Sequence, residues 1–334
     1  MTTPLFQLFK GGTDLMVAMA PFFISATYND EAGHTNDTLE VVLADRAREL
    51  PLPTEDDLLV AFGGYVGGKV AMLGAFKVQG WTGEWEPGNP ETMTMQARAA
   101  TFTGEIKAFG SKHWDDATLG SILQDTAKAA GLTLAIDPEL ASTEIPYALR
   151  WEASPIDFAT RLADEHGGIV KAAGKRLAVV KKGSGKGADG AQLPVIRVTR
   201  SGSSGWSIEA EPRPRQGDVS ASWIDPATGR RELETEKTGK KGPKHSLIHV
   251  RASRAEAKAA AKAKAAELNM LTGSGHFIVP FDPANVAGAF VQASGFGRGI
   301  DGQWSSESIS TTWAKGKATL STINVKAKPD EEEE

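Results

Sequence analysis

The 334-residue chain contains no cysteine, so disulfide frameworks, thiolate zinc sites and cysteine nucleophiles are excluded. Aromatic residues are few, at 7%. Neither charge sign dominates, because 37 Lys and Arg against 42 Asp and Glu leave a formal net charge of −5. A chain with this balance lacks the basic character of a general nucleic-acid or anionic-membrane binder, and we expect neither kind of partner.

Long apolar runs are also absent. The most apolar N-terminal run, residues 15–24, is far too short to span a bilayer, so no membrane span is expected. Lys10 before the run and small residues after it resemble a signal peptide, but Asp14 opens the run and Pro21 splits it. We interpret this run as a first pair of buried strands.

The remaining composition is that of an ordinary globular protein, with 40% hydrophobic and 24% charged residues. The length is sufficient for two or three domains. Residues 22–110 predict short strands separated by turns. Strict alternation marks two of these strands, at Leu39, Val41 and Leu43 and at Met93, Met95, Ala97 and Ala99. Gly74 interrupts a third run, residues 70–78, and predicts a bulge there. This spacing favours a small antiparallel barrel or sandwich.

Residues 111–180 predict a different, mixed unit. Its first helix carries an apolar stripe beginning at Leu119 and stops at Gly131, with oxygens of Asp115, Asp116 and Thr118 placed to cap its first turn. A half-buried strand follows, up to Ile136. Ser154, with Pro155 directly after it, starts a second helix that Gly167 and Gly168 end. A hairpin completes the unit.

The C-terminal part predicts strands again, from Val195 onward. Residues 181–190 are low in complexity and predict a flexible seam. The highly charged segment 225–245 predicts a long exposed loop or hairpin tip. Ser253 and Glu256 form a capping box for an alanine-rich helix, 253–268. The chain ends in an acidic tail, 329–334.

Several motifs have structural explanations that outweigh chemical ones. Glycine-rich residues 183–187 and 295–299 lack the strand-to-helix context of a phosphate loop and are interpreted as turns. His245 and His249 have the spacing of paired metal ligands, but no third ligand is evident. We therefore expect no metal and no cofactor.

Catalysis by carboxylates is the more serious alternative. Asp115, Asp116, Glu165 and His166 all belong to the mixed unit and could meet in space, as a glycosidase or lytic enzyme would require. The two aspartates are already explained as charges at a helix start, and Glu165 and His166 as the exposed end of the second helix. We expect no enzyme and no catalytic residue.

Four blocks of the sequence, the first made of two segments, resemble one family. The segment from Trp114 to Ile122 (WDDATLGSI) and the helix from Ser154 to Ala163 (SPIDFATRLA) look like the late control protein D family. Residues 37–45 (DTLEVVLAD) resemble its early strand, residues 253–266 its alanine-rich helix, and residues 295–304 (GFGRGIDGQW) its late glycine-rich segment. The resemblance covers about residues 22–326. It departs at 310–312 (STT), where relatives often carry a histidine, and in the charged insert 229–245 and the acidic tail.

This resemblance implies a structural baseplate hub protein of contractile phage tails, related to the hub part of type VI secretion spike proteins. The implied fold is α+β and mainly β, with two tube-like β-barrel domains and an inserted helix–strand–helix–hairpin unit. The first barrel domain would then be residues 1–110, followed by the inserted unit, 111–182, and a linker, 183–194. The second barrel domain would be residues 195–328, including helix 253–268, and residues 329–334 would be the acidic tail.

The implied assembly is a homotrimeric ring with pseudo-six-fold symmetry. A central spike would sit on one face, and the tail tube with other baseplate proteins on the other face. Localisation would be the virion baseplate, assembled in the bacterial host cytoplasm. We also hypothesise that the insert near residues 230–244 contacts a neighbouring baseplate protein. Two alternatives stay open, namely a cell-wall-degrading or peptidoglycan-binding tail protein centred on residues 111–180, and the hub of a type VI or tail-like particle.

Overall fold

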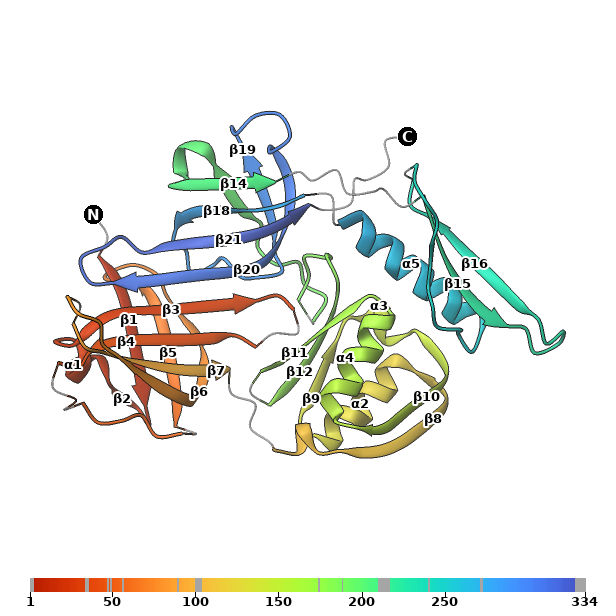
Figure 1. Ribbon diagram of the computed structural model, residues 1–334, viewed down its shortest axis with the longest axis horizontal. Helices are drawn as coiled ribbons and strands as arrows, with labels where there is room; N and C mark the ends of the chain where they lie inside the picture. The colour runs from red at the N-terminus through yellow and green to blue at the C-terminus, as the bar shows by residue number, and fades with distance from the viewer. Residues whose placement is uncertain are drawn as a thin grey trace.

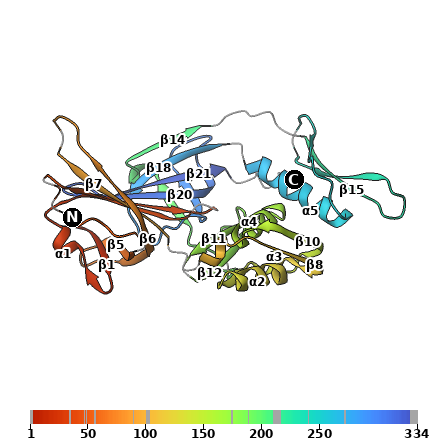
Figure 2. The same ribbon diagram turned by 60° about the horizontal axis from the view of Figure 1, so that its bottom comes forward.

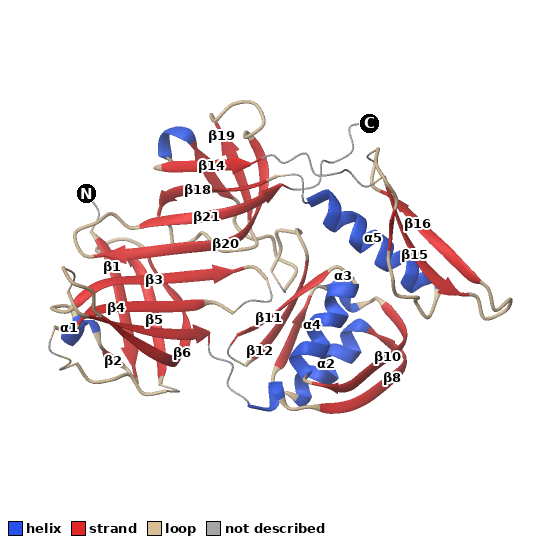
Figure 3. Cartoon of the chain, viewed as in Figure 1, coloured by secondary structure: helices blue, strands red, loops and turns tan. Residues whose placement is uncertain are grey.

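The computed structural model describes residues 3–33, 36–46, 48, 50–55, 57–88, 90–99, 104–173, 175–187, 189–209, 217–239, 241–270 and 273–327. Strands dominate, while the longer helices are confined to the middle of the chain and to one helix near its C-terminal part (Figure 3). The mainly β, α+β class predicted from the sequence is confirmed. None of the described helices is long and apolar enough to cross a membrane.

A 13-stranded sheet unites the two ends of the chain. Its N-terminal strands are β1 (Pro4–Lys10), β2 (Thr13–Asp14), β3 (Phe23–Glu31), β4 (Thr38–Ala44), β5 (Leu58–Tyr65), β6 (Val70–Glu84) and β7 (Thr92–Ala99). Its C-terminal strands are β13 (Ile196–Thr199), β14 (Gly205–Glu209), β18 (Ser274–Pro280), β19 (Phe290–Ser294), β20 (Gly302–Ala314) and β21 (Leu320–Ala327). The two groups join where β3 pairs antiparallel with β20, from Glu31 opposite Ser308 to Ser25 opposite Ala314 (Figure 1).

Each group of strands has its own hydrophobic core. The predicted alternation is confirmed in β4 and β7, whose buried side chains are Leu39, Val41, Leu43, Met93, Met95 and Ala97. The second core gathers Phe277, Ile309, Ile323 and their neighbours on the C-terminal strands. The predicted bulge is also confirmed, because Gly74 has φ 157° and lies at a register shift between β5 and β6.

The interpretation of residues 15–24 as a strand pair is wrong. Met16–Met19 form a short helix, α1, and β3 begins only at Phe23. Leu15, Met16 and Met19 are partly buried against the first core. The apolar side chains that suggested buried strands therefore pack against the first core from a helix.

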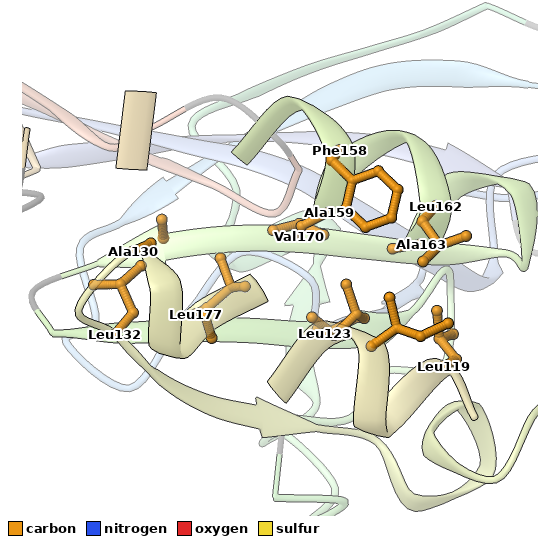
Figure 4. Close-up of a cluster of buried hydrophobic side chains, with 14 of the residues drawn as sticks. Leu119, Leu123, Ala130, Leu132, Phe158, Ala159, Leu162, Ala163, Val170 and Leu177 are labelled. Atoms are coloured by element: carbon orange, nitrogen blue, oxygen red, sulfur yellow. The ribbon is translucent and has the colours of Figure 1, made fainter. Parts of the chain in front are cut away.

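The middle of the chain forms the predicted mixed unit. Its elements are a 3₁₀ turn (Gly104–Lys107), β8 (Gly110–Thr118), α2 (Leu119–Ala129), β9 (Thr133–Ile136), α3 (Pro138–Ala141), β10 (Glu144–Ala153), α4 (Pro155–Glu165), β11 (Gly168–Ala173) and β12 (Arg176–Lys181). Leu119 and Leu123 of α2 point toward Phe158 and Leu162 of α4, with Val170 beside them (Figure 4). Burial between the helices and the β9–β12–β11 sheet holds this unit together.

The start of α2 differs from the prediction. Thr118 caps the helix, accepting a hydrogen bond from the amide of Ser121 at 3.2 Å. Asp115 and Asp116 are not first-turn residues, because they lie in β8, which pairs antiparallel with β10. Strands β8 and β10 and the short helix α3 were not predicted from the sequence.

The remaining elements form a separate projection, which we call the arm. It consists of β15 (Asp218–Ile224), β16 (Arg231–Lys237), β17 (His245–Ser246) and α5 (Arg254–Met270). Figures 1 and 2 show the β15–β16 hairpin extending away from the rest of the molecule in both views. Helix α5 confirms the predicted alanine-rich helix. Of the two structures predicted for 225–245, the long loop is wrong for residues 231–237, which pair along the whole of β15, while residues 225–230 form the tip of the β15–β16 hairpin.

Residues 183–187 and 189–194, proposed from the sequence as most of a linker, lie against the C-terminal strands. The amide of Leu193 donates to the carbonyl of Gly185 at 2.8 Å. Gly185 has φ 63°, and an added Cβ would meet the Phe290 ring at 2.5 Å, so both conformation and space require glycine there. The acidic tail 329–334 lies outside the described residues.

Candidate functional site

The glycine-rich motifs are turns, as interpreted from the sequence. In the second of them, the Asp301 carboxylate accepts hydrogen bonds from the amides of Phe296 at 2.8 Å and Gly297 at 3.2 Å. A carboxylate of the chain itself therefore occupies the amides that a phosphate would need. His245 and His249 gain no third ligand, and no group of three potential metal-ligating side chains is present in the described part of the chain.

The four residues considered for catalysis divide into two separate sites. Asp115 lies on β8 opposite Tyr147, and its Oδ2 is 3.6 Å from Nε2 of His113. Glu165 and His166 lie at the C-terminal end of α4, where Glu165 Oε2 is 3.5 Å from Arg251 Nη1. Each pair thus has its own partner, and the described residues show no interaction between the pairs.

The most heavily charged buried site lies where the mixed unit meets the large sheet. Lys171 of β11 reaches Asp37 Oδ1 at 2.7 Å, the Glu31 carbonyl at 2.7 Å and Asp30 Oδ1 at 3.1 Å. The other oxygen of Asp30 accepts from the amide of Ala287 at 2.8 Å. One ammonium group therefore connects β11 to the end of β3 and to Asp37 before β4, and Asp30 extends the contact to the loop before β19.

The pKa values at this site follow from burial and from the close charges. Burial opposes the charge on Lys171, but the carboxylates of Asp30 and Asp37 outweigh it and raise its pKa. Burial likewise raises the pKa of Asp37, with Lys171 acting in the opposite direction. Burial and these two aspartates raise the pKa of Tyr28. The ion pair is thus held in an environment that penalises any unpaired charge.

A second polar joint connects the mixed unit to the arm. Besides the contact between Arg251 and Glu165, it contains three buried polar atoms without a hydrogen-bond partner among the described residues: His166 Nδ1, Arg251 Nε and Trp223 Nε1, the last on the strand position paired with Arg251. Burial, and secondarily the charge of Arg251, lower the pKa of His166 to about 4. The mixed unit and the arm therefore meet through a polar interface and not through a continuous hydrophobic core.

The large sheet also offers surfaces for association. An open groove of about 870 Å³ lies between the start of β1 and the β20–β21 turn, lined by Phe6, Phe23, Tyr65, Trp313, Lys315 and Lys317, among others. One end of the sheet is β14, which pairs only with β18, and the other end is β1 with the short β2. Unpaired strand edges of this kind are templates for pairing with another chain.

Two curated proteins are similar in sequence to this chain. The probable baseplate hub protein of Escherichia phage P2 is 30% identical over 223 residues, covering 66% of this chain and 57% of that protein. The probable baseplate hub protein of Escherichia phage 186 is 27% identical over 263 residues, covering 78% of this chain and 67% of that protein. This chain is similar in sequence to both of these phage baseplate hub proteins. The resemblance to baseplate hub proteins predicted from the sequence blocks is confirmed, while neither relative carries the name late control protein D.

Solved structures of tail proteins share the fold. The 43 kDa tail protein of prophage MuSo2 from Shewanella oneidensis superimposes with a TM-score of 0.69 over 97% of this chain and 98% of that chain, at 13% identity. The Escherichia coli c3393 protein, a type VI secretion component similar to the T4 tail proteins gp27 and gp5, gives 0.54 over 93% and 74%, at 9% identity. No family model matches the chain.

Proposed function

We propose that the chain is a structural baseplate hub protein of a contractile phage tail or a related particle. Three copies form a ring with pseudo-six-fold symmetry that joins a central spike to the tail tube. The sequence similarity to baseplate hub proteins carries this proposal, although the chain spans only 57% of the first of them. The structural likeness to a type VI secretion component supports a spike as one partner. The site of action is the virion baseplate, after assembly in the bacterial host cytoplasm.

The continuous sheet supports the proposed symmetry. Its two groups of strands, each with its own core, lie side by side across the β3–β20 pairing. We propose that the two groups act as two similar tube-like domains. Three chains then present six such domains around one axis, which matches a six-fold tube, while the ring itself keeps the three-fold symmetry of a spike.

Edge-strand pairing between copies is the proposed source of the ring contacts. In β14, Ser207 is exposed and Trp206 is 41% exposed, so this edge is accessible to another strand. A lysine at position 207 would place a charge at the edge and should oppose pairing. We expect Ser207→Lys to reduce the trimer fraction at least tenfold in sedimentation velocity, with an unchanged circular dichroism spectrum.

The matched control is Ser201→Lys, at an exposed position in the short 3₁₀ turn Arg200–Gly202 that precedes β14. It adds the same charge away from the strand edge and should leave the trimer intact. Equal trimer fractions for the two variants would mean that β14 is not at the ring interface.

The proposed role is association without turnover. The structure gives Asp115 and Glu165 separate partners, so the alternative of a cell-wall enzyme centred on residues 111–180 gains no support from their geometry. A zymogram of the purified full chain tests this point directly. We expect no clearing of peptidoglycan, and a cleared band that Glu165→Gln abolishes would replace the hub proposal with the enzymatic one.

A further inference from the structure

One face of the arm exposes several large apolar side chains among the described residues. Val219 and Ala221 of β15 are buried against α5, and Glu234 on the same face of β16 accepts from Arg254 Nε at 2.7 Å. Side chains alternate along a strand, so the intervening positions point to the opposite side. We call this opposite side the outer face of the arm.

Aliphatic side chains concentrate on the outer face. Leu233 lies opposite Ser222 on the neighbouring strand and is 61% exposed. Ile224 follows two residues after Ser222, and the segment that runs beside β15 adds Ile248, which is 87% exposed, and Val250. A projecting hairpin that exposes four large aliphatic side chains together has the character of an interaction site.

The charges of the arm are sorted between its two faces. Glu232, Glu234 and Glu236 share the face toward the lysine-rich helix α5, whereas Arg231 and Lys237 share the outer face with Leu233. The carboxylate on the outer face of β15, Asp218, lies opposite Lys237 and 3.9 Å from Lys244 Nζ. The outer face therefore combines apolar surface with an excess of positive charge.

A surface of complementary character lies on the mixed unit. Strand β10 turns Ala148 toward the core and exposes Tyr147, Leu149 and Trp151, the last at 69%. These three side chains lie at alternate positions of the strand, and we call them the β10 strip. Its neighbour β8 places Asp115 opposite Tyr147 and His113 opposite Leu149.

Acidic groups border the β10 strip. Asp115, Asp116 and Glu152 are all exposed beside it. Asp116 has φ 46° and Glu152 has φ 42°, and the register between β8 and β10 shifts between Arg150 and Ala153, next to Glu152. The strip thus presents a tyrosine and a tryptophan within an acidic border, and aromatic side chains are enriched at the centres of protein interfaces.

We propose that the outer face of the arm docks on the β10 strip of a second copy of this chain. Both surfaces are apolar at the centre, and their borders carry opposite charges, Arg231 and Lys237 on one and Asp115, Asp116 and Glu152 on the other. Opposite borders align two surfaces and select against wrong partners. Because the two surfaces differ, the contact is heterologous and passes from each copy to the next.

This inference relies on the proposed ring only as the source of the neighbouring copy. The edge pairing at β14 and the docking of the arm are separate contacts, on different elements. The arm would give each copy a second contact with its neighbour, in addition to the pairing of sheet edges. Both surfaces belong to this chain, so the contact can be tested with the purified protein, without the spike or the tube.

The absence of native cysteine allows a direct crosslinking test. One protein carries Leu233→Cys or Ile248→Cys on the arm, and a differently tagged protein carries Tyr147→Cys or Trp151→Cys on the strip. The two are mixed, oxidised mildly, and separated on a non-reducing gel. A disulfide requires Cα atoms within about 7 Å, so only direct docking yields the mixed dimer. Val17→Cys on α1, which is 80% exposed, serves as the control for random collision.

We expect at least one of the four arm–strip combinations to crosslink at least tenfold more than any combination with Val17→Cys. In that combination, Arg231→Glu with Lys237→Glu should reduce the yield at least fivefold, and Asp115→Lys in the other protein should restore part of it. Yields equal to the Val17 control would overturn the proposal. They would also be the result if a different baseplate protein were the natural occupant of the arm.

Two further outcomes separate this inference from the proposed function. The first uses a single chain that carries both Leu233→Cys and Trp151→Cys. If this chain forms only an internal disulfide, the arm packs on the β10 strip of its own chain, and docking between copies is wrong. Trimers in sedimentation without arm–strip crosslinks would overturn the arm contact and leave the ring standing. Arm–strip crosslinks in a protein that never exceeds a dimer would support the arm contact and contradict the ring.

Discussion

Lys171 is the residue on which the junction of the mixed unit with the large sheet depends most. It is paired with Asp30 and Asp37, whose side chains are each 13% exposed. Removing one member of a buried ion pair leaves the other charge uncompensated, which costs more than the pair contributes when intact. The Lys171 ammonium group therefore connects β11 directly to the end of β3.

We predict that Lys171→Met lowers the free energy of unfolding by about 3 kcal/mol, because it strands two buried carboxylates. Urea denaturation at pH 7 measures the loss. Lys181→Met is the matched control. Its partner Glu139 is 71% exposed, so this surface pair should contribute less than about 1 kcal/mol. Similar losses for both variants would show that the buried site has no special role.

His166 makes the joint between the mixed unit and the arm sensitive to pH. Its pKa is lowered to about 4 from an ordinary value of 6.5, so the folded joint favours the neutral imidazole. As the pH falls below 6.5, the unfolded state gains a proton that the folded state resists, and stability is lost progressively down to pH 4. Burial is the larger cause of the lowered pKa of His166 and the charge of Arg251 the smaller one. Glu165 also lies at this joint, with its Oε2 3.5 Å from Arg251 Nη1.

We predict that the wild-type chain loses about 2.5 kcal/mol more stability between pH 7 and pH 4.5 than His166→Gln does. Glutamine keeps a polar side chain but cannot titrate. Chemical denaturation of both proteins at the two pH values provides the comparison, because the carboxylates common to both cancel. Parallel losses would place the acid sensitivity elsewhere.

At the scale of elements, small residues determine how closely α5 lies on the arm. Ala257, Ala261 and Ala265 are spaced one helical turn apart and are all buried against Val219 and Ala221. Side chains without further methylenes let the helix approach the sheet closely, and a larger residue at the same place would force the two apart.

We predict that Ala261→Leu destabilises the arm by about 1–3 kcal/mol through overpacking. Hydrogen exchange should accelerate in β15, β16 and α5, while β4 and β7 of the large sheet remain protected. Ala266→Leu is the control, since Ala266 is exposed on the same helix. Uniform acceleration through the whole chain would contradict an arm that is stabilised locally.

The elements predicted from the sequence are those stabilised by burial of a regular apolar pattern. Helix α2 and strand β4 are examples, because each buries one face of side chains at the period of its structure. Strand β16 was missed since its inward face carries three glutamates that face a lysine-rich helix. Strand β10 was missed because a change of face near Pro146 interrupts its alternation.

The candidate interaction sites were harder to predict than the elements. The aspartates at 115 and 116 drew attention as possible catalytic groups, but nothing in their sequence context indicates a strand beside an exposed tyrosine and tryptophan. Lys171 lies in an unremarkable hairpin, and its partners Asp30 and Asp37 are more than 130 residues away in the chain. Contacts of this range arise from tertiary packing and leave no local pattern.

At the scale of the whole molecule, the continuous sheet determines what the chain can assemble into. The sheet ends in β14 at one side and in β1 with β2 at the other, so each copy can offer an edge to a neighbour on either side. Edges on two different strands favour a heterologous contact, which closes into a ring when the rotation between copies fits. A ring of three copies is the assembly that we propose.

Native mass spectrometry of the purified full chain tests that claim most directly. If three copies form a ring, the dominant species at micromolar concentration has three times the 35.4 kDa chain mass. We expect this species to be lost in Ser207→Lys. The ring of three would be contradicted if the protein remained a monomer up to the highest accessible concentration, or if it formed only dimers.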